Sequence, residues 1–129
     1  MAALGSAVAF LVHSNLFISI AATSVALSTM LLAGISPDFL PLFIVFAATL
    51  FVYSLNRITD IEEDRENVPT RAPFTERYGR ALLVIGTALY VIAIAGAIAP
   101  EPPCALFLLL PLPAAASYSL FRVTQLLPV

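Results

Sequence analysis

The sequence contains no lysine and no tryptophan, only one cysteine, and very little charge of either sign. The single cysteine, Cys104, excludes an internal disulfide framework and a metal centre built from several thiolates. Six arginines and eight acidic residues make up 11% of the chain, whereas 60% of it is hydrophobic. Soluble domains are about half apolar and about one quarter charged. The composition therefore excludes a water-soluble globular domain and predicts an integral membrane protein.

The few charged residues are concentrated in one segment. Five of the six arginines and six of the eight acidic residues lie between Arg57 and Arg80. An ionised side chain at the centre of a membrane helix costs about 2.5 to 3.5 kcal/mol on insertion scales, so this distribution leaves the rest of the chain free to enter a bilayer. The formal net charge is −2, and basic residues form no stripe outside this segment. Nucleic acid is therefore not expected as a partner.

The apolar sequence divides into four predicted membrane helices. A crossing helix needs about 20 predominantly apolar residues. Proline, glycine and charged residues separate segments of roughly this length, and we predict helices over residues 7–33, 41–64, 80–99 and 104–121. Two prolines in the last segment, Pro111 and Pro113, predict a kink that packs against protein. The expected fold is all-α, a transmembrane bundle of four helices in a single domain over residues 1–129.

The arginines predict the orientation of this bundle. With four crossings, the charged loop 57–80 and both termini lie on the same side of the membrane, and that side holds all six arginines. The positive-inside rule makes this side cytoplasmic. No Lys or Arg precedes the first apolar segment, so we expect it to be retained as a span instead of cleaved as a signal peptide. The predicted location is the cell membrane, in multi-pass topology.

One polar pattern in the charged loop points to metal chemistry. Asn56, Asp60 and Asp64 are spaced by four residues, so they line one face of a continuous helix. Two carboxylates one turn apart repel each other by about 0.2 to 0.5 kcal/mol, and a cation between them reverses that sign. Mg²⁺ takes oxygen ligands from one or two carboxylates and completes its shell with waters and phosphate oxygens. Nearby arginines supply forked hydrogen bonds to phosphate: Arg65, Arg71, Arg77 and Arg80.

The same residues are open to a plainer interpretation. Charged residues commonly follow the cytoplasmic end of a span, where they orient the protein. The loop 57–80 then serves as a solvated connector or as a docking element for a cytoplasmic partner, in a small membrane protein without catalysis. Metal dependence separates the two interpretations.

The pattern Asn56-Arg57-x-x-Asp60-x-x-x-Asp64 resembles the first aspartate-rich motif of the UbiA-type intramembrane prenyltransferases, Asn-Asp-x-x-Asp-x-x-x-Asp. In that family the motif lies at the cytoplasmic end of the second helix, which is its predicted place here. The segment 68–74, which contains Arg71, is similar to the family's Arg-containing loop. Weaker similarities involve Asn15, which resembles an asparagine of the family's first helix, and Tyr118 with Arg122, which resemble a Tyr-x-x-x-Lys/Arg pair ending its fourth helix.

The resemblance implies a transferase that moves an isoprenyl group from a prenyl diphosphate to a lipophilic acceptor with Mg²⁺ as cofactor, surrounded by membrane lipid. It implies that Asn56, Asp60 and Asp64 are the catalytic metal ligands. By the same resemblance Arg71 and Arg122 contact phosphate, and Asn15 and Tyr118 line the substrate pocket. Neither the acceptor nor the length of the prenyl chain follows from these residues.

The chain also departs from the family pattern. Arg57 replaces the second residue of the motif, which is normally Asp, and its side chain is expected either to contact phosphate directly or to extend to the membrane interface. Val12 with His13 replaces an Arg-Pro pair before Asn15. Family members have nine helices and a second aspartate-rich motif, whereas this sequence holds four predicted helices and no second Asp-x-x-x-Asp pattern. We interpret the chain as the N-terminal portion of such an enzyme: a truncated gene product, a fragment, or half of a split protein whose second half is a candidate partner. Without that half, a metal bound by one motif lacks its opposing acidic helix end.

Overall fold

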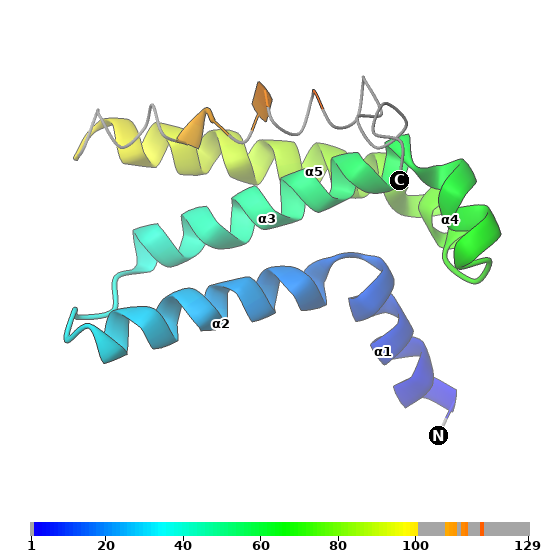
Figure 1. Cartoon of the computed structure of the whole chain (residues 1–129), viewed down its shortest axis with the longest axis horizontal. Coiled ribbons are helices and arrows are strands. Elements are labelled where there is room, and N and C mark those ends of the chain that lie inside the picture. Colours follow the sequence, from blue (N-terminus) through cyan, green and yellow to red (C-terminus); the bar gives the residue numbers. More distant parts are fainter. Residues whose placement is uncertain (1, 101–107, 111, 114–116, 118–129) are drawn as a thin grey trace, which may run out of the picture.

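The computed structural model describes residues 2–100, 108–110, 112–113 and 117. Within that part of the chain the longer regular elements are five helices, and no strand occurs (Figure 1). Their bounds are α1 (Ala2–His13), α2 (Leu16–Leu32), α3 (Phe39–Thr59), α4 (Ile61–Asn67) and α5 (Ala72–Ile98). The all-helical prediction is therefore confirmed for the described residues.

Two of these helices are long and apolar enough to cross a membrane. They are α3, with 21 residues, and α5, with 27 residues. At 1.5 Å per residue these lengths correspond to about 32 Å and about 40 Å, against a hydrocarbon core of about 30 Å. The pair of α1 and α2 counts as a third crossing if the bent pair forms one span. The structure thus contains two or three helices suited to a membrane.

The first predicted helix, 7–33, is not continuous. It is broken between α1 and α2, which meet at an angle of 71°. The break is at Asn15, whose φ of 64° lies in the left-handed region, and Ser14 beside it is completely buried. Ser19 supports the new helix start, since its hydroxyl donates to the Asn15 carbonyl oxygen at 2.9 Å. The Ser19 N–H donates to the same carbonyl oxygen at 3.1 Å, so α2 begins directly after Asn15. Hydropathy does not indicate the break, because the residues on both sides of it are apolar.

The turn between α2 and α3 is built from Gly34 and Asp38. Gly34 has a φ of 70°, a conformation that glycine adopts readily, and its N–H donates to the Leu31 carbonyl oxygen at 3.1 Å. The Asp38 side chain accepts a hydrogen bond from the Leu40 N–H at 3.2 Å and so caps α3. α3 therefore begins at Phe39, two residues before the predicted start at residue 41.

The second predicted helix, 41–64, is also interrupted. α3 ends at Thr59, Asp60 has φ −103° and ψ 20°, and α4 begins at Ile61. The Asn56 carbonyl oxygen accepts both the Asp60 N–H at 3.0 Å and the Thr59 hydroxyl at 2.9 Å in this last turn. Three acidic residues in the first turn of α4 favour a new helix N-terminus at this point. The prediction of one helix through residue 64 was therefore wrong in its continuity.

The third predicted helix, 80–99, begins earlier than expected. α5 starts at Ala72, with Pro73 in its first turn, where the missing proline N–H costs no helical bond. Glu76, Arg77 and Arg80 consequently lie on α5 and not in a loop, so the connector is shorter than the predicted loop 57–80. Most of the fourth predicted helix, 104–121, lies outside the described residues.

The core of the fold is the contact between α3 and α5, the most extensive contact between any two helices, and α2 packs on the other side of α3 (Figure 1). The Phe51 and Tyr90 rings stack with centroids 5.2 Å apart. Small residues allow the backbones to approach: a Cβ placed on Gly86 would lie 3.2 Å from the Phe51 Cα. Close packing through small residues is typical of helices in membranes.

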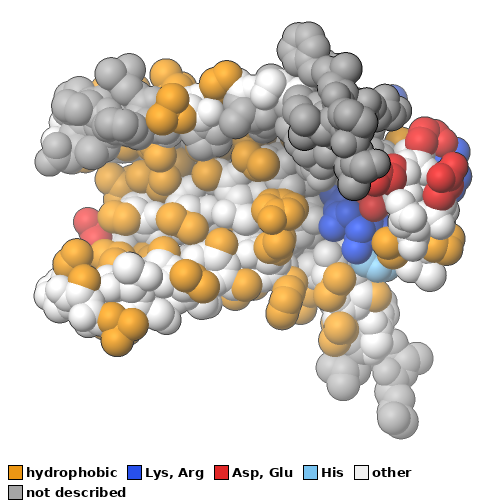
Figure 2. Space-filling model, viewed as in Figure 1, with side chains coloured by type: hydrophobic (Ala, Val, Ile, Leu, Met, Phe, Trp, Pro, Cys, Tyr) orange, Lys and Arg blue, Asp and Glu red, His pale blue; other side chains and the backbone are white. Residues whose placement is uncertain are grey.

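The outward faces of the long helices are apolar. Val84 and Val91 on α5 are 68% and 58% exposed, and Val25 on α2 is 67% exposed. Hydrophobic side chains cover the visible lengths of the helices, whereas most visible charged side chains gather at the end where α4 lies (Figure 2). Such surfaces suit contact with lipid tails along the helices and with water and headgroups at the charged end.

The close approach at Gly86 predicts a strong effect of side-chain size. Gly86→Leu forces α3 and α5 apart, and we expect it to lower the free energy of unfolding by about 1 to 3 kcal/mol. Gly5→Leu is the matched control, because nothing lies within 4 Å of a Cβ at Gly5. Unfolding in mixed detergent micelles, followed by circular dichroism, measures both variants. Equal stabilities would contradict the packing described here.

Candidate functional site

A polar cavity of about 220 Å³ lies where α3 ends and α4 begins. The predicted metal ligands Asn56, Asp60 and Asp64 all line it. The other lining residues are Arg57, Glu63 and Asn67. The break at Asp60 does not separate these residues, because α4 continues the chain beside the last turn of α3. The structure thus brings the three residues of the sequence pattern to one cavity.

Asp64 is the most heavily engaged acid of this cavity. Its carboxylate accepts hydrogen bonds from Arg57 Nη1 at 3.1 Å and 3.3 Å and from Arg71 Nη1 at 3.1 Å. One carboxylate oxygen, Oδ1, is shared by both guanidinium groups. The three side chains are largely buried, with exposed fractions of 13% for Asp64, 22% for Arg57 and 20% for Arg71. Screening by water is therefore weaker here than for a surface ion pair.

Asp60 and Glu63 differ from Asp64. Neither has an ion pair with any residue that the structure describes. Asp60 is partly buried at the helix break, and its Oδ1 atom lies 3.5 Å from the Thr59 hydroxyl. Glu63 is exposed at the rim. Among the described residues, the carboxylates of Asp60 and Glu63 therefore have no counterion, whereas that of Asp64 has two.

A second ion-pair cluster lies on the exposed side of α4. Arg65 binds Glu62 at 2.9 Å and Glu76 at 2.5 Å, and so ties α4 to the first turns of α5. The hydrogen bond to Glu76 and the charge of Glu62 raise the pKa of Arg65 above its usual value. Because these side chains are about half exposed, the cluster contributes little to stability and serves mainly to position α4.

The donor set of the cavity is compatible with Mg²⁺ but does not form a complete cage. Among the described residues, no three His, Cys, Asp or Glu side chains are grouped so that they could hold a metal ion alone. Mg²⁺ usually keeps several waters and takes one or two carboxylates together with substrate phosphates. Asn56 and Asp60 supply oxygens of this kind, and Asp64 does so once its carboxylate leaves a guanidinium group.

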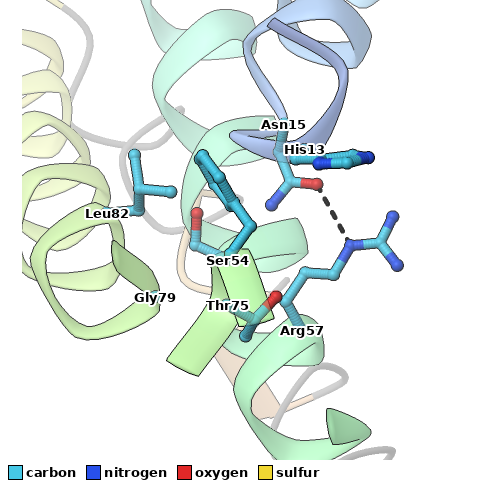
Figure 3. A pocket seen from close by; sticks show the side chains of 8 residues that line it. His13, Asn15, Ser54, Arg57, Thr75, Gly79 and Leu82 are labelled. Carbon is cyan, nitrogen blue, oxygen red and sulfur yellow. Dashed lines mark hydrogen bonds between the residues drawn. The ribbon is translucent and has the colours of Figure 1, made fainter. Parts of the chain in front are cut away.

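Figure 3 shows a smaller cavity, which has about the size of one water molecule at roughly 10 Å³. Arg57 lines both cavities, and its Nε donates to Asn15 Oδ1 at 3.3 Å. Ser54 is 2% exposed, and its hydroxyl finds no hydrogen-bond partner among the described residues. The full lining consists of His13, Asn15, Ser54, Arg57, Phe74, Thr75, Gly79 and Leu82.

The predicted substrate-binding residues differ in whether the structure places them near the polar cavity. Arg71 lies at the start of α5 and reaches the polar cavity through Asp64. Asn15 is 2% exposed and reaches it through Arg57. Tyr118 and Arg122 lie outside the described residues.

Sequence reasoning did not identify the role of Arg57, which joins Asn15, 42 positions earlier in the chain, to Asp64. The only signal was that an arginine interrupts an otherwise acidic pattern next to an apolar helix. The spacing of residues near Arg57 does not predict this contact, because the break at Asn15 places the Asn15 side-chain oxygen beside the guanidinium group from 42 positions away in the chain. Ser54 gave no signal, since serines are frequent in these apolar segments.

Comparisons with known proteins identify no relative. No family model, no curated protein and no solved structure matches this chain. The interpretation of the site therefore rests on its own residues and on the resemblance of its motif.

The backbone at Asn15 predicts an unusual order of stability between two variants. Asn15→Gly and Asn15→Ala both lose the bond to Arg57, but only glycine adopts the left-handed conformation without a steric penalty. We expect the alanine variant to be less stable by about 1 kcal/mol, the reverse of the order inside a regular helix. Unfolding in mixed micelles measures the difference. An alanine variant that matches or exceeds the glycine variant would rule out the break.

Proposed function

We propose that this chain binds a prenyl diphosphate together with Mg²⁺ and belongs to an intramembrane prenyltransferase of the UbiA type, as its N-terminal portion. The observation that carries the proposal is the polar cavity at the end of α3, a helix long enough to cross a membrane. Asn56, Asp60 and Asp64, which form the motif of the resemblance, all line that cavity. A headgroup in the cavity leaves the prenyl chain beside the apolar helices.

Each residue has a defined part in this proposal. Asn56, Asp60 and Asp64 hold the cation, and Arg71, with Arg122, neutralises phosphate charge. Bound Mg²⁺ supplies positive charge to the leaving diphosphate. Transfer breaks the bond between the prenyl carbon and the diphosphate oxygen, and the electron pair leaves with the oxygen. The prenyl carbon bonds to the nucleophilic atom of the acceptor, which releases a proton. Preplaced arginine N–H groups stabilise this charge as it develops, because they need no rearrangement when it forms.

The proposal extends to the arrangement in the membrane. Four helices would cross it, with the charged segment and both termini in the cytoplasm of a multi-pass cell-membrane protein. The support is the separation of charge: exposed apolar side chains cover the long helices, and ion pairs concentrate around α4. The lipophilic acceptor would reach the site through the membrane, and a second half of the enzyme would supply the opposing acidic helix end.

A second candidate function is favoured by the ion pairs themselves. Arg65 pairs with Glu62 and Glu76, and Arg57 and Arg71 pair with Asp64, without any ligand. A charged segment in which part of the charge pairs internally also suits a small non-catalytic membrane protein, in which it sets orientation or docks a partner. Such a protein has no requirement for Mg²⁺, and this property separates the two candidates.

The transferase proposal predicts a metal-dependent effect at Asp60. Asp60→Asn keeps the shape of the side chain and removes one proposed metal ligand, so we expect prenyl diphosphate binding in saturating Mg²⁺ to weaken about tenfold or more. Calorimetric titration of the purified chain in uncharged detergent measures this affinity. Glu62→Gln is the matched control, since Glu62 lies outside the cavity and is bound to Arg65.

Two results would contradict the proposal. One is binding of prenyl diphosphate with the same affinity in Mg²⁺ and in chelator. The other is an equal loss of affinity in Asp60→Asn and Glu62→Gln, which would indicate a general effect of net charge.

A further inference from the structure

Two arginines that meet at one carboxylate form an unusual arrangement. Arg57 comes from the last turn of α3 and Arg71 from the start of α5, yet both donate to Oδ1 of Asp64. The group has two positive charges against one negative charge, in side chains that are about four-fifths buried or more. Arg71 has a further donor left over, because its Nε atom is buried and finds no partner among the described residues. The arrangement has more positive charge and more donors than Asp64 satisfies.

We infer that Arg57 and Arg71 form a binding site for a phosphoryl group and that Asp64 occupies this site in the absence of ligand. The inference rests on the proposed function for the identity of the ligand, a diphosphate, and goes beyond it in assigning Arg57 as a phosphate contact and Asp64 as the group that the phosphate displaces.

A phosphoryl group competes well with Asp64 for these donors. It has three strong acceptor oxygens and a charge of about −1.5 to −2, whereas a carboxylate has two oxygens and a charge of −1. Arginine forms forked hydrogen bonds with either group. Replacement of the Asp64 carboxylate by a phosphoryl group therefore leaves each guanidinium group with a hydrogen-bond partner. It also compensates the second positive charge, which Asp64 alone does not neutralise.

Asn15 keeps Arg57 in place during this exchange. Its side-chain oxygen accepts from Arg57 Nε, while the contact with Asp64 uses Nη1. Loss of Asp64 from Nη1 leaves the Nε bond intact, so the guanidinium group stays oriented between the two cavities. Asp64, by contrast, lies on α4, a seven-residue helix bounded by the break at Asp60 and by Val68. Within the described part of the chain its carboxylate accepts hydrogen bonds only from Arg57 and Arg71, so it is the group that the exchange releases.

The unpaired acids of the cavity give the exchange its dependence on a cation. Asp60 and Glu63 repel an anion that enters beside Arg57. A divalent cation at these acids removes that repulsion and attracts Asp64 away from the arginines. Cation binding and anion binding then favour each other, and by linkage each raises the affinity for the other by the same factor.

Metal-free binding of inorganic pyrophosphate tests the inference directly. The full chain is titrated calorimetrically in uncharged detergent with chelator present. We expect Asp64→Asn to bind pyrophosphate about tenfold more tightly than the parent, because both arginines are released. Glu63→Gln is the matched control, since it removes one negative charge from the same cavity but touches neither arginine, and it should gain only about twofold.

A second comparison assigns the gain to Arg57. In the Asp64→Asn background, Arg57→Gln should abolish the gain, and Arg65→Gln, an equal change of charge on the exposed side of α4, should preserve most of it. Circular dichroism on each variant verifies that the helices remain. Equal gains for Asp64→Asn and Glu63→Gln would overturn the inference, as would an unchanged affinity when Arg57 is replaced in folded protein.

The phosphoryl group can come from a soluble diphosphate or from a lipid headgroup, and a competition arm distinguishes these sources. Phosphatidic acid added to the micelles will lower pyrophosphate affinity in Asp64→Asn if headgroups reach the two arginines. No competition identifies a soluble diphosphate as the source. Competition that persists after Arg57→Gln would count against the site, because it would then reflect surface charge.

The outcomes separate this inference from the proposed function. If Asp64→Asn gains pyrophosphate affinity while prenyl diphosphate binds no better than pyrophosphate in Mg²⁺, the anion site stands and the transferase proposal fails. If prenyl diphosphate binds in a Mg²⁺-dependent manner but Asp64→Asn gains nothing in chelator, the exchange at Asp64 is wrong and the transferase proposal stands.

Discussion

The exclusion of ionised groups from the hydrocarbon layer is the constraint on which this structure depends. It confines eleven of the fourteen charged residues to positions 57–80, and these residues must be neutralised or hydrated within a small volume. The ion pairs of Asp64 and of Arg65 follow from that crowding. The same exclusion leaves the interior of the helix bundle with little besides apolar and small side chains, so the contact between α3 and α5 relies on close packing at Gly86 and on the Phe51–Tyr90 stack.

Interruptions of the helices build the site. The break at Asn15 turns a buried amide oxygen toward Arg57, and the break at Asp60 begins a short helix that brings Asp64 back over the end of α3. The early start of α5 adds Arg71 from a third direction. Continuous helices over the same residues would extend the acidic segment away from Asn15. The polar cavity thus depends on irregular backbone at the end of an apolar helix that is long enough to cross a membrane.

Composition and spacing predict the helical class and the residues around the polar cavity, because both follow from local sequence. Apolar runs determine where long helices form, and the four-residue spacing of Asn56, Asp60 and Asp64 keeps them on one side even across a break. The breaks themselves were not predicted. At Thr59 and Ser19 the hydroxyl groups bond to the preceding backbone, a choice that serines and threonines elsewhere in these helices make without breaking them. The link between Asn15 and Arg57 depends on tertiary structure alone.

The distribution of ion pairs helps to weigh the two candidate functions. A segment that serves only for orientation needs no particular arrangement of acids around its arginines, because orientation depends on the arginines themselves. Here two arginines share Asp64, while Asp60 and Glu63 have no ion pair within the described part of the chain. Water hydrates the charge of an exposed acid such as Glu63 at little cost in free energy. Asp60 is partly buried, and the side chains of Arg57 and Arg71 are largely buried, so water hydrates their charges less well. Asp60 and Glu63 line the cavity without an ion pair, whereas Arg57 in the same cavity and Arg71 beside it share one carboxylate. A cation with a bound diphosphate would compensate both kinds of charge. This imbalance supports a binding function more than it supports a connector.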